Sequence, residues 1–126
     1  MFKNLLITCF LGMLAIILGA FAAHALKETL TIAQLMSFET AVRYQMYHVI
    51  VLLFVNIYNG FSSKQKNLIS YLFFFGILCF SGSIYTIQLT SLTAKSIWFI
   101  TPLGGILFVI GWWIMFTIFI KKYSKS

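Results

Sequence analysis

The side chains that could do chemistry in this 126-residue chain are few, and five of them gather in one short stretch. Glu39 and Arg43 are spaced i,i+4, so on a helix they share a face and can pair. Tyr44 and His48 have the same spacing, and Tyr47 lies four residues beyond Arg43. A cluster of this kind could bind a lipid headgroup, gate water or pass protons.

The same stretch also has a structural interpretation. Arg43 near a helix end can extend to the membrane interface, and Tyr44 and Tyr47 can belong to an aromatic belt. His48 can be a buried side chain that holds helices together by hydrogen bonds, and His24 can lie in water at the end of its helix. The sequence leaves both interpretations open.

Metal binding and catalysis have little support in the sequence. His24 and His48 would need a third ligand, and Glu39 is the only obvious one. No HExxH, GxSxG, phosphate-loop or GxGxxG pattern occurs, and there is no aspartate. Because paired-carboxylate chemistry would need both glutamates and Glu28 is predicted to be exposed, we expect no metal, no cofactor and no enzymatic activity.

The elements that must position these residues are membrane spans. Hydrophobic residues make up 61% of the chain and charged residues 9%, whereas a soluble domain carries about 25% charged residues. The first apolar run is longer than the core of a signal peptide, so we expect it to remain as a helix. The sequence predicts a single all-α domain, an antiparallel four-helix transmembrane bundle with spans at about 5–26, 40–59, 68–89 and 97–120.

The second predicted span is unusual because its clearly apolar part is too short to cross a bilayer. To reach the ~20 residues that a span requires, it must extend back to about Thr40, which places Arg43 in or near the membrane. The pair Thr31 and Gln34 fits a capping box, and it predicts a separate helix on the membrane surface just before this span.

The distribution of lysines predicts the orientation. One side of the four-span arrangement holds six lysines and no acid, and the other holds both glutamates. The positive-inside rule therefore places both termini in the cytoplasm. This placement also explains the net charge of +7 better than nucleic-acid binding does. The six residues are Lys3, Lys64, Lys66, Lys121, Lys122 and Lys125.

Antiparallel spans would collect the polar side chains in the outer half of the bundle and leave the inner half nearly all aliphatic and aromatic. Glu39, Arg43 and His48 are expected nearer the outer surface than the midplane, with His24 at a similar depth. The candidate site or polar network is His24, Glu39, Arg43, Tyr44, Gln45, Tyr47, His48, Ser81 and Ser83.

Small residues predict where helix backbones approach closely. We expect packing within the bundle, with a homo-oligomer interface as the alternative. Ala15, Gly19 and Ala23, spaced by four, would form one stripe. Pro102 is expected to bend or start the fourth helix. The packing residues expected across the chain are Ala15, Gly19, Ala23, Gly76, Gly82, Gly104, Gly105 and Gly111.

Four motifs occur in order and cover nearly the whole chain. They are 19–26 (GAFAAHAL), 38–48 (FETAVRYQMYH), 80–85 (FSGSIY), and 101–105 (TPLGG) followed by 111–112 (GW). Together they resemble the domain-of-unknown-function 423 family of small bacterial inner-membrane proteins, whose relatives include transmembrane protein 256. The resemblance implies a four-span protein of the bacterial inner membrane with no established reaction. The family form of the first motif is GAFGAHGL, so two alanines replace glycines here.

Three functions follow as expectations. The first is a non-enzymatic protein that binds a lipid headgroup or a partner membrane protein through the polar cluster, with Arg43 facing a phosphate. The second is a proton, ion or small-solute transporter or channel component, which would need an oligomer. The third, ranked last, is a membrane enzyme.

Overall fold

The computed structural model describes residues 2–125, which form four long helices joined by short connections. The helices are α1 (Phe2–His24), α2 (Ile32–Ile57), α3 (Ser63–Leu89) and α4 (Ile100–Tyr123), with a short 3-10 turn, η1 (Leu26–Glu28), after α1. All four are long and apolar enough to cross a membrane. The protein is therefore an all-α bundle of four spans, as predicted.

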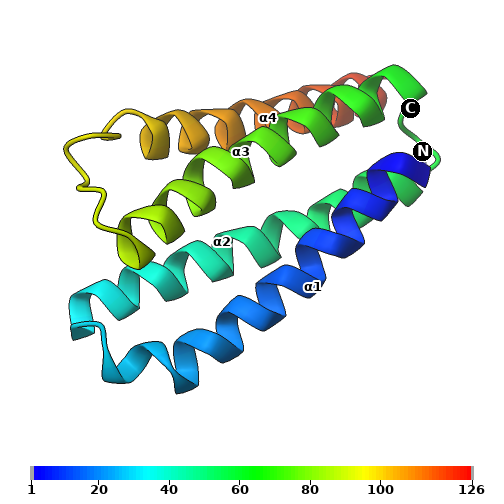
Figure 1. Ribbon diagram of the computed structural model, residues 1–126. Helices are drawn as coiled ribbons and strands as arrows, with labels where there is room; N and C mark the ends of the chain where they lie inside the picture. Colours follow the sequence, from blue (N-terminus) through cyan, green and yellow to red (C-terminus); the bar gives the residue numbers. More distant parts are fainter. Residues whose placement is uncertain (1, 126) are drawn as a thin grey trace.

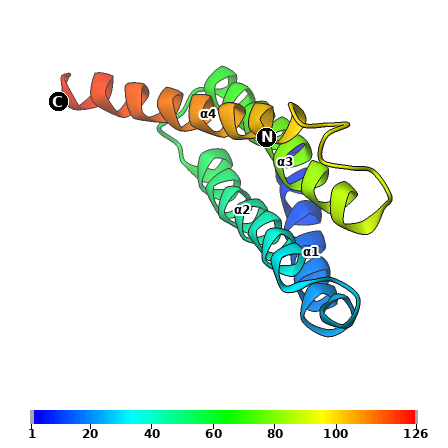
Figure 2. The ribbon, with the colours of Figure 1, turned by 90° about the vertical axis from the view of Figure 1, so that its left-hand side faces the viewer.

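The helices pack as two antiparallel hairpins, α1 with α2 and α3 with α4 (Figure 1). Close backbone packing joins α2 to α3 as well, so each helix lies against its neighbours in the chain. Both termini and the α2–α3 turn lie at one end of the bundle, and Figure 2 shows α4 inclined to α2. We call the end with the termini the lysine-rich end, because the six lysines named above belong to it.

Capping residues decide where α2 and α3 begin. The Thr31 side chain accepts from the Gln34 backbone while the Gln34 side chain accepts from the Thr31 backbone, and Ser62 and Gln65 repeat this arrangement for α3. The predicted capping box is thus confirmed, but no separate surface helix follows it. The helix that it starts continues without a break into the span, with Phe38 fully buried.

Small residues bring α1 and α2 close together. A methyl group added at Gly12 would lie 3.1 Å from Val49, and one added at Gly19 would lie 3.4 Å from Val42. These two pairings place the helices antiparallel in a constant register. Large side chains at either glycine would force the helices apart.

The stripe of small residues on α1 differs from the predicted one. Ala15 and Ala22 are 1% exposed, whereas Ala23 is exposed. A helix has 3.6 residues per turn, so a strict spacing of four drifts away from a contact face. Spacings of three and four alternate instead, and Ala22 takes the place that we assigned to Ala23.

Aromatic rings cover glycines between α3 and α4. A side chain at Gly104 would overlap the backbone nitrogen of Phe80 and lie 2.8 Å from its Cα, so the two backbones themselves are close. By contrast, a methyl group at Gly105 would lie 3.9 Å from the Phe80 ring, and one at Gly82 would meet nothing closer than 3.8 Å. The ring-over-glycine pairs are Phe108 with Gly76 and Phe73 with Gly111.

Candidate functional site

His48 is enclosed by α3 and α4 and is 5% exposed. Its ring stacks on Phe108, with centroids 3.6 Å apart and planes 7° apart. Its Nδ1 lies 2.7 Å from the Tyr44 carbonyl oxygen, and Trp112 donates its indole N–H to Nε2 at 3.3 Å. Because a carbonyl only accepts and an indole N–H only donates, the hydrogen bonds assign the neutral ring with its hydrogen on Nδ1.

Gln45 joins three helices and is 1% exposed. Its amide nitrogen donates to the Leu11 carbonyl of α1 at 2.8 Å. The Tyr85 hydroxyl of α3 donates to its amide oxygen, also at 2.8 Å. Both ends of the amide are therefore occupied by contacts within the bundle.

Two serines of α3 complete these contacts. Ser81 donates to the Ala41 carbonyl of α2 at 2.7 Å, and the hydroxyls of Ser83 and Thr101 lie 2.5 Å apart, joining α3 to α4. We call Gln45, His48, Ser81, Ser83 and their partners the central polar layer. It ties all four helices together, which favours the structural interpretation of its members.

The depth of His48 differs from the sequence expectation. In the register set by the two α1 glycines, His48 is level with about Met13, the middle residue of α1. It therefore lies near the middle of the bundle rather than in the outer half. The hydropathy of α2 alone could not show this, because the helix begins eight residues earlier than the predicted span.

The charged members of the predicted cluster point away from the bundle. Glu39 and Arg43 are exposed, and Tyr47 is 54% exposed. Arg43 donates to the Thr40 hydroxyl at 3.2 Å, and no ion pair between Arg43 and Glu39 forms in the described chain. We call Glu39, Thr40, Arg43 and Tyr47 the charged face of α2.

The Tyr44 side chain and His24 belong to neither group. The Tyr44 ring stacks on Phe80 of α3, with centroids 4.9 Å apart and planes 27° apart. His24 is exposed at the end of α1. In the α1–α2 register Arg43 is level with about Leu18, so His24 lies roughly 9 Å further out along the bundle. His24 and Arg43 therefore lie in the same half of the bundle but do not form one site.

A second polar layer, which the sequence analysis missed, lies near the lysine-rich end. Asn4 of α1 donates to Asn56 of α2 at 3.1 Å and to Asn67 of α3 at 2.9 Å. Asn56 in turn donates to Ser70 at 2.9 Å, and Lys66 donates to the Asn56 carbonyl at 2.8 Å. The expectation of an inner half that is nearly all aliphatic and aromatic therefore overlooked a buried polar layer.

The sequence contains the asparagines of this layer, but their positions in it do not predict burial. Asn4 and Asn67 precede apolar runs and Asn56 follows one, positions where an asparagine usually caps a helix or faces water. Here Asn4 is 3% exposed and Asn56 is fully buried. Every buried side-chain nitrogen and oxygen within residues 2–125 has a hydrogen-bond partner, as the low dielectric of a membrane interior demands.

An apolar groove of about 270 Å³ opens between α1 and α3. Gln45 and Tyr85 belong to its wall, but their polar atoms are used by the hydrogen bonds described above. Within residues 2–125, no three His, Cys, Asp or Glu side chains come together as a metal site would require. The other wall residues of the groove are Ile7, Leu11, Leu14, Phe74, Ile77, Leu78 and Gly82.

Four apolar helices joined by two polar layers define a small multi-pass membrane protein. Residues 18–105 match a family described as "Protein of unknown function (DUF423)". The chain belongs to this family, as the four motifs indicate, and it is a multi-pass protein of the bacterial inner membrane.

Several bacterial relatives carry the name UPF0382 membrane protein. One from Staphylococcus saprophyticus is 45% identical over 101 residues, covering 80% of this chain and 82% of the relative. One from a bovine strain of Staphylococcus aureus is 42% identical over 113 residues, covering 90% of each chain. One from Haemophilus influenzae is 38% identical over 110 residues, covering 87% of each chain. No solved structure shows significant similarity to this chain.

The four motifs meet in space. The first motif contributes Ala22 and Leu26, which pack with Phe38 of the second and Tyr85 of the third. The fourth contributes Trp112, the donor to His48. The motifs therefore hold the helices together, and they leave the charged face of α2 as the part of the second motif that is free to meet a ligand.

Proposed function

We propose that this protein is a non-enzymatic membrane protein that binds an anionic lipid headgroup at the charged face of α2. Arg43 carries the proposal, because it is exposed on a span and, within residues 2–125, its guanidinium has only a neutral hydroxyl as its partner. A cation in the hydrocarbon region is costly unless it is paired or reaches polar groups. A lipid phosphate within reach would supply the missing charge.

The depth of Arg43 suits this role. It lies roughly 9 Å further into the bundle than His24, which marks the end of α1. An arginine side chain extends over several ångströms toward the headgroups, and a guanidinium binds two phosphate oxygens at once. Tyr47, one turn further in, offers an exposed ring to the acyl region.

The transport alternative gains no support from the same residues. A proton relay from Glu39 to His48 would need a shared path, but Glu39 faces outward and both ring nitrogens of His48 are occupied. For catalysis, we find no nucleophile paired with a base among the contacts of the central polar layer.

The test compares lipid retention by the purified protein in native mass spectrometry, using phosphatidylglycerol and phosphatidylcholine in equal amounts. Arg43→Gln should weaken the preference for phosphatidylglycerol roughly ten- to hundredfold, the loss of a hydrogen bond to a charged group. Lys95→Gln is the control, since it removes the same charge from an exposed loop on the same side. Equal preference in wild type and Arg43→Gln would contradict the proposal.

A further inference from the structure

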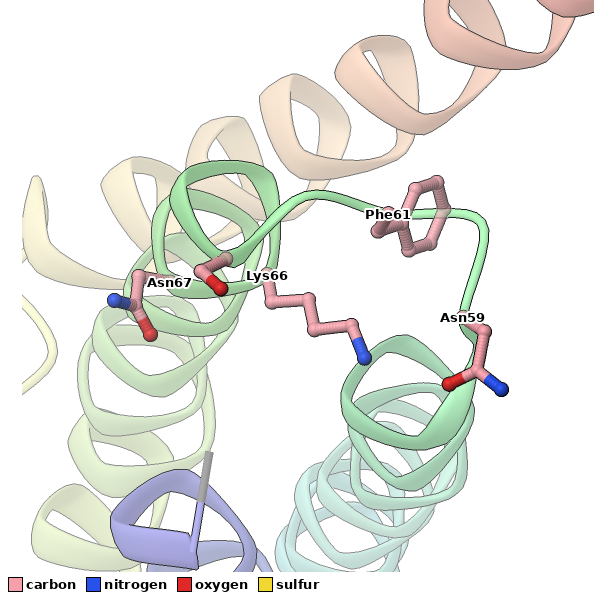
Figure 3. A pocket seen from close by; sticks show the side chains of 5 residues that line it. Asn59, Phe61, Lys66 and Asn67 are labelled. Atoms are coloured by element: carbon pink, nitrogen blue, oxygen red, sulfur yellow. The ribbon is translucent and has the colours of Figure 1, made fainter.

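A polar pocket of about 220 Å³ lies at the lysine-rich end, beside the α2–α3 turn. Figure 3 shows Lys66 reaching from α3 toward the end of α2, where Asn59 and Phe61 lie, with Asn67 on the α3 side. Ser63 completes the lining. Four of these five side chains carry N–H or O–H donors and none carries a carboxylate, which is a composition suited to an anion.

The donors of this pocket retain capacity for a ligand. Lys66 uses one N–H on the Asn56 carbonyl at 2.8 Å, and an ammonium group has three. Asn67 accepts from Asn4 through its side-chain oxygen, which leaves its NH2 as a donor. Phe61 is 4% exposed and forms an apolar wall. A charge beside an apolar wall interacts more strongly with an anion than a charge in open water does.

The charged side chains around the pocket have one sign. Lys122 of α4 reaches the same turn, donating to the Gly60 carbonyl, with its ammonium 6.0 Å from the centroid of the Phe61 ring. The chain has only two acids, and both precede the midpoint of α2, away from this end. Lysines gathered at one end without Asp or Glu side chains concentrate anions there.

The capping box already uses the backbone N–H groups of Ser62 and Gln65 at the start of α3. An anion in the pocket would be held chiefly by side chains, with Lys66 supplying the charge. Lys64, two residues away, is exposed and does not line the pocket, so it provides an internal comparison.

We propose that the pocket lined by Asn59, Phe61, Ser63, Lys66 and Asn67 binds a phosphate-class anion, either free phosphate or the phosphate of a lipid headgroup. The site is independent of the lipid site proposed at Arg43, because it lies at the opposite end of the bundle. The positive-inside rule places it on the cytoplasmic side, where anionic headgroups and soluble phosphate are both present.

The first arm of the test uses inorganic phosphate and the full chain in phosphatidylcholine nanodiscs, with sodium chloride at equal ionic strength as the reference. Phosphate should raise the apparent melting temperature of the wild type and of Lys64→Gln. Lys66→Gln and Asn59→Asp should need roughly ten- to hundredfold more phosphate for the same rise. All three variants lower the net charge by one, so charge alone cannot separate them.

Asn59→Asp guards against a misfolded Lys66 variant, because Asn59 is exposed and its substitution leaves Lys66 itself unchanged. An equal response to phosphate in all four proteins would overturn the proposal. So would the absence of any wild-type response together with a negative result in the lipid arm.

The lipid arm uses Arg43→Gln protein, so that the charged face of α2 does not contribute. Retention of phosphatidylglycerol over phosphatidylcholine should fall further when Lys66→Gln or Asn59→Asp is added, and should not fall when Lys64→Gln is added. A positive lipid arm with no effect of free phosphate identifies the ligand as a headgroup. The effect of Arg43→Gln alone on phosphatidylglycerol retention tests only the lipid site at the charged face of α2. The proposals for that site and for the pocket can therefore fail separately.

Discussion

The side-chain amide of Asn4 donates to the side-chain oxygen of Asn56, 3.1 Å away, and so ties the second residue after the start of α1 to the penultimate residue of α2. Asn56 also donates to Ser70 of α3. One amide thus joins three helices close to the lysine-rich end. Asn56 is fully buried, and its neighbours would lose their partners if it were removed.

Asn56→Leu should therefore destabilise the protein by about 1–3 kcal/mol, the cost of leaving buried polar groups unpaired, although hydrogen bonds between membrane helices are often weaker than this. Thermal unfolding in detergent measures the change. Asn59→Leu is the control, because Asn59 is exposed just beyond the same helix. Similar melting temperatures for the two variants would show that the asparagine layer contributes little.

Adjacent glycines of α4 should respond in opposite ways to the same substitution. Gly104→Ala places a methyl group against the Phe80 backbone, which cannot move aside without separating α3 from α4. We expect a loss of about 1–3 kcal/mol or more from overpacking. Gly105→Ala meets only the Phe80 ring, at 3.9 Å.

Gly105→Ala should be neutral or slightly stabilising, because alanine favours helix over glycine. Thermal unfolding of the two variants under identical conditions provides the comparison. If Gly105→Ala proved as damaging as Gly104→Ala, the α3–α4 register described above would be incorrect.

His48 should be a neutral ring with its hydrogen on Nδ1. The protein has two histidines, so nitrogen NMR of histidine-labelled protein at neutral pH shows two sets of ring signals. In the His24→Gln variant only the signals of His48 remain, which assigns them. We expect Nδ1 of His48 to be protonated and Nε2 to be an acceptor. A ring with its hydrogen on Nε2 would be incompatible with the hydrogen bond that Trp112 donates to that atom.

Two neighbouring tryptophans test the same contact by substitution. Trp112→Phe removes the donor to His48 and should cost about 0.5–2 kcal/mol. Trp113 is 62% exposed on the outside of α4, and Trp113→Phe should change stability by less than about 0.5 kcal/mol. Apparent melting temperatures separate these outcomes, and equal losses would argue against a specific role for Trp112.

Both termini should face the cytoplasm, which cysteine labelling can check in intact cells. In a Cys9→Ala, Cys79→Ala background, Ser91→Cys lies in the α3–α4 connection and Ser124→Cys lies just after α4. A membrane-impermeant maleimide should label Ser91→Cys only, and both after the cells are opened. Labelling of Ser124→Cys in intact cells would show that the C-terminus faces outward, opposite to the predicted orientation.

The number of spans, their antiparallel arrangement and the lysine-rich end could all be predicted from the sequence. Hydropathy and loop charge are local properties, and they determine separately for each segment whether it crosses the bilayer and in which direction. The Thr31–Gln34 capping box is local too. The start of α2 was misplaced because its first turns are mixed in polarity. These turns are helical because Phe38 is buried against α1 and α3, and that burial depends on residues far away in the chain.

The sequence by itself determined that this chain crosses the membrane four times and that polar residues must sit within the spans. Only the tertiary structure decided which of them are enclosed and which are exposed. Gln45 and Arg43 are two residues apart, and the turn of the helix places one in the central polar layer and the other outside it. Helix rotation and register depend on distant pairs such as Gly12 with Val49 and Gly104 with Phe80, because close packing requires complementary shapes from both partners.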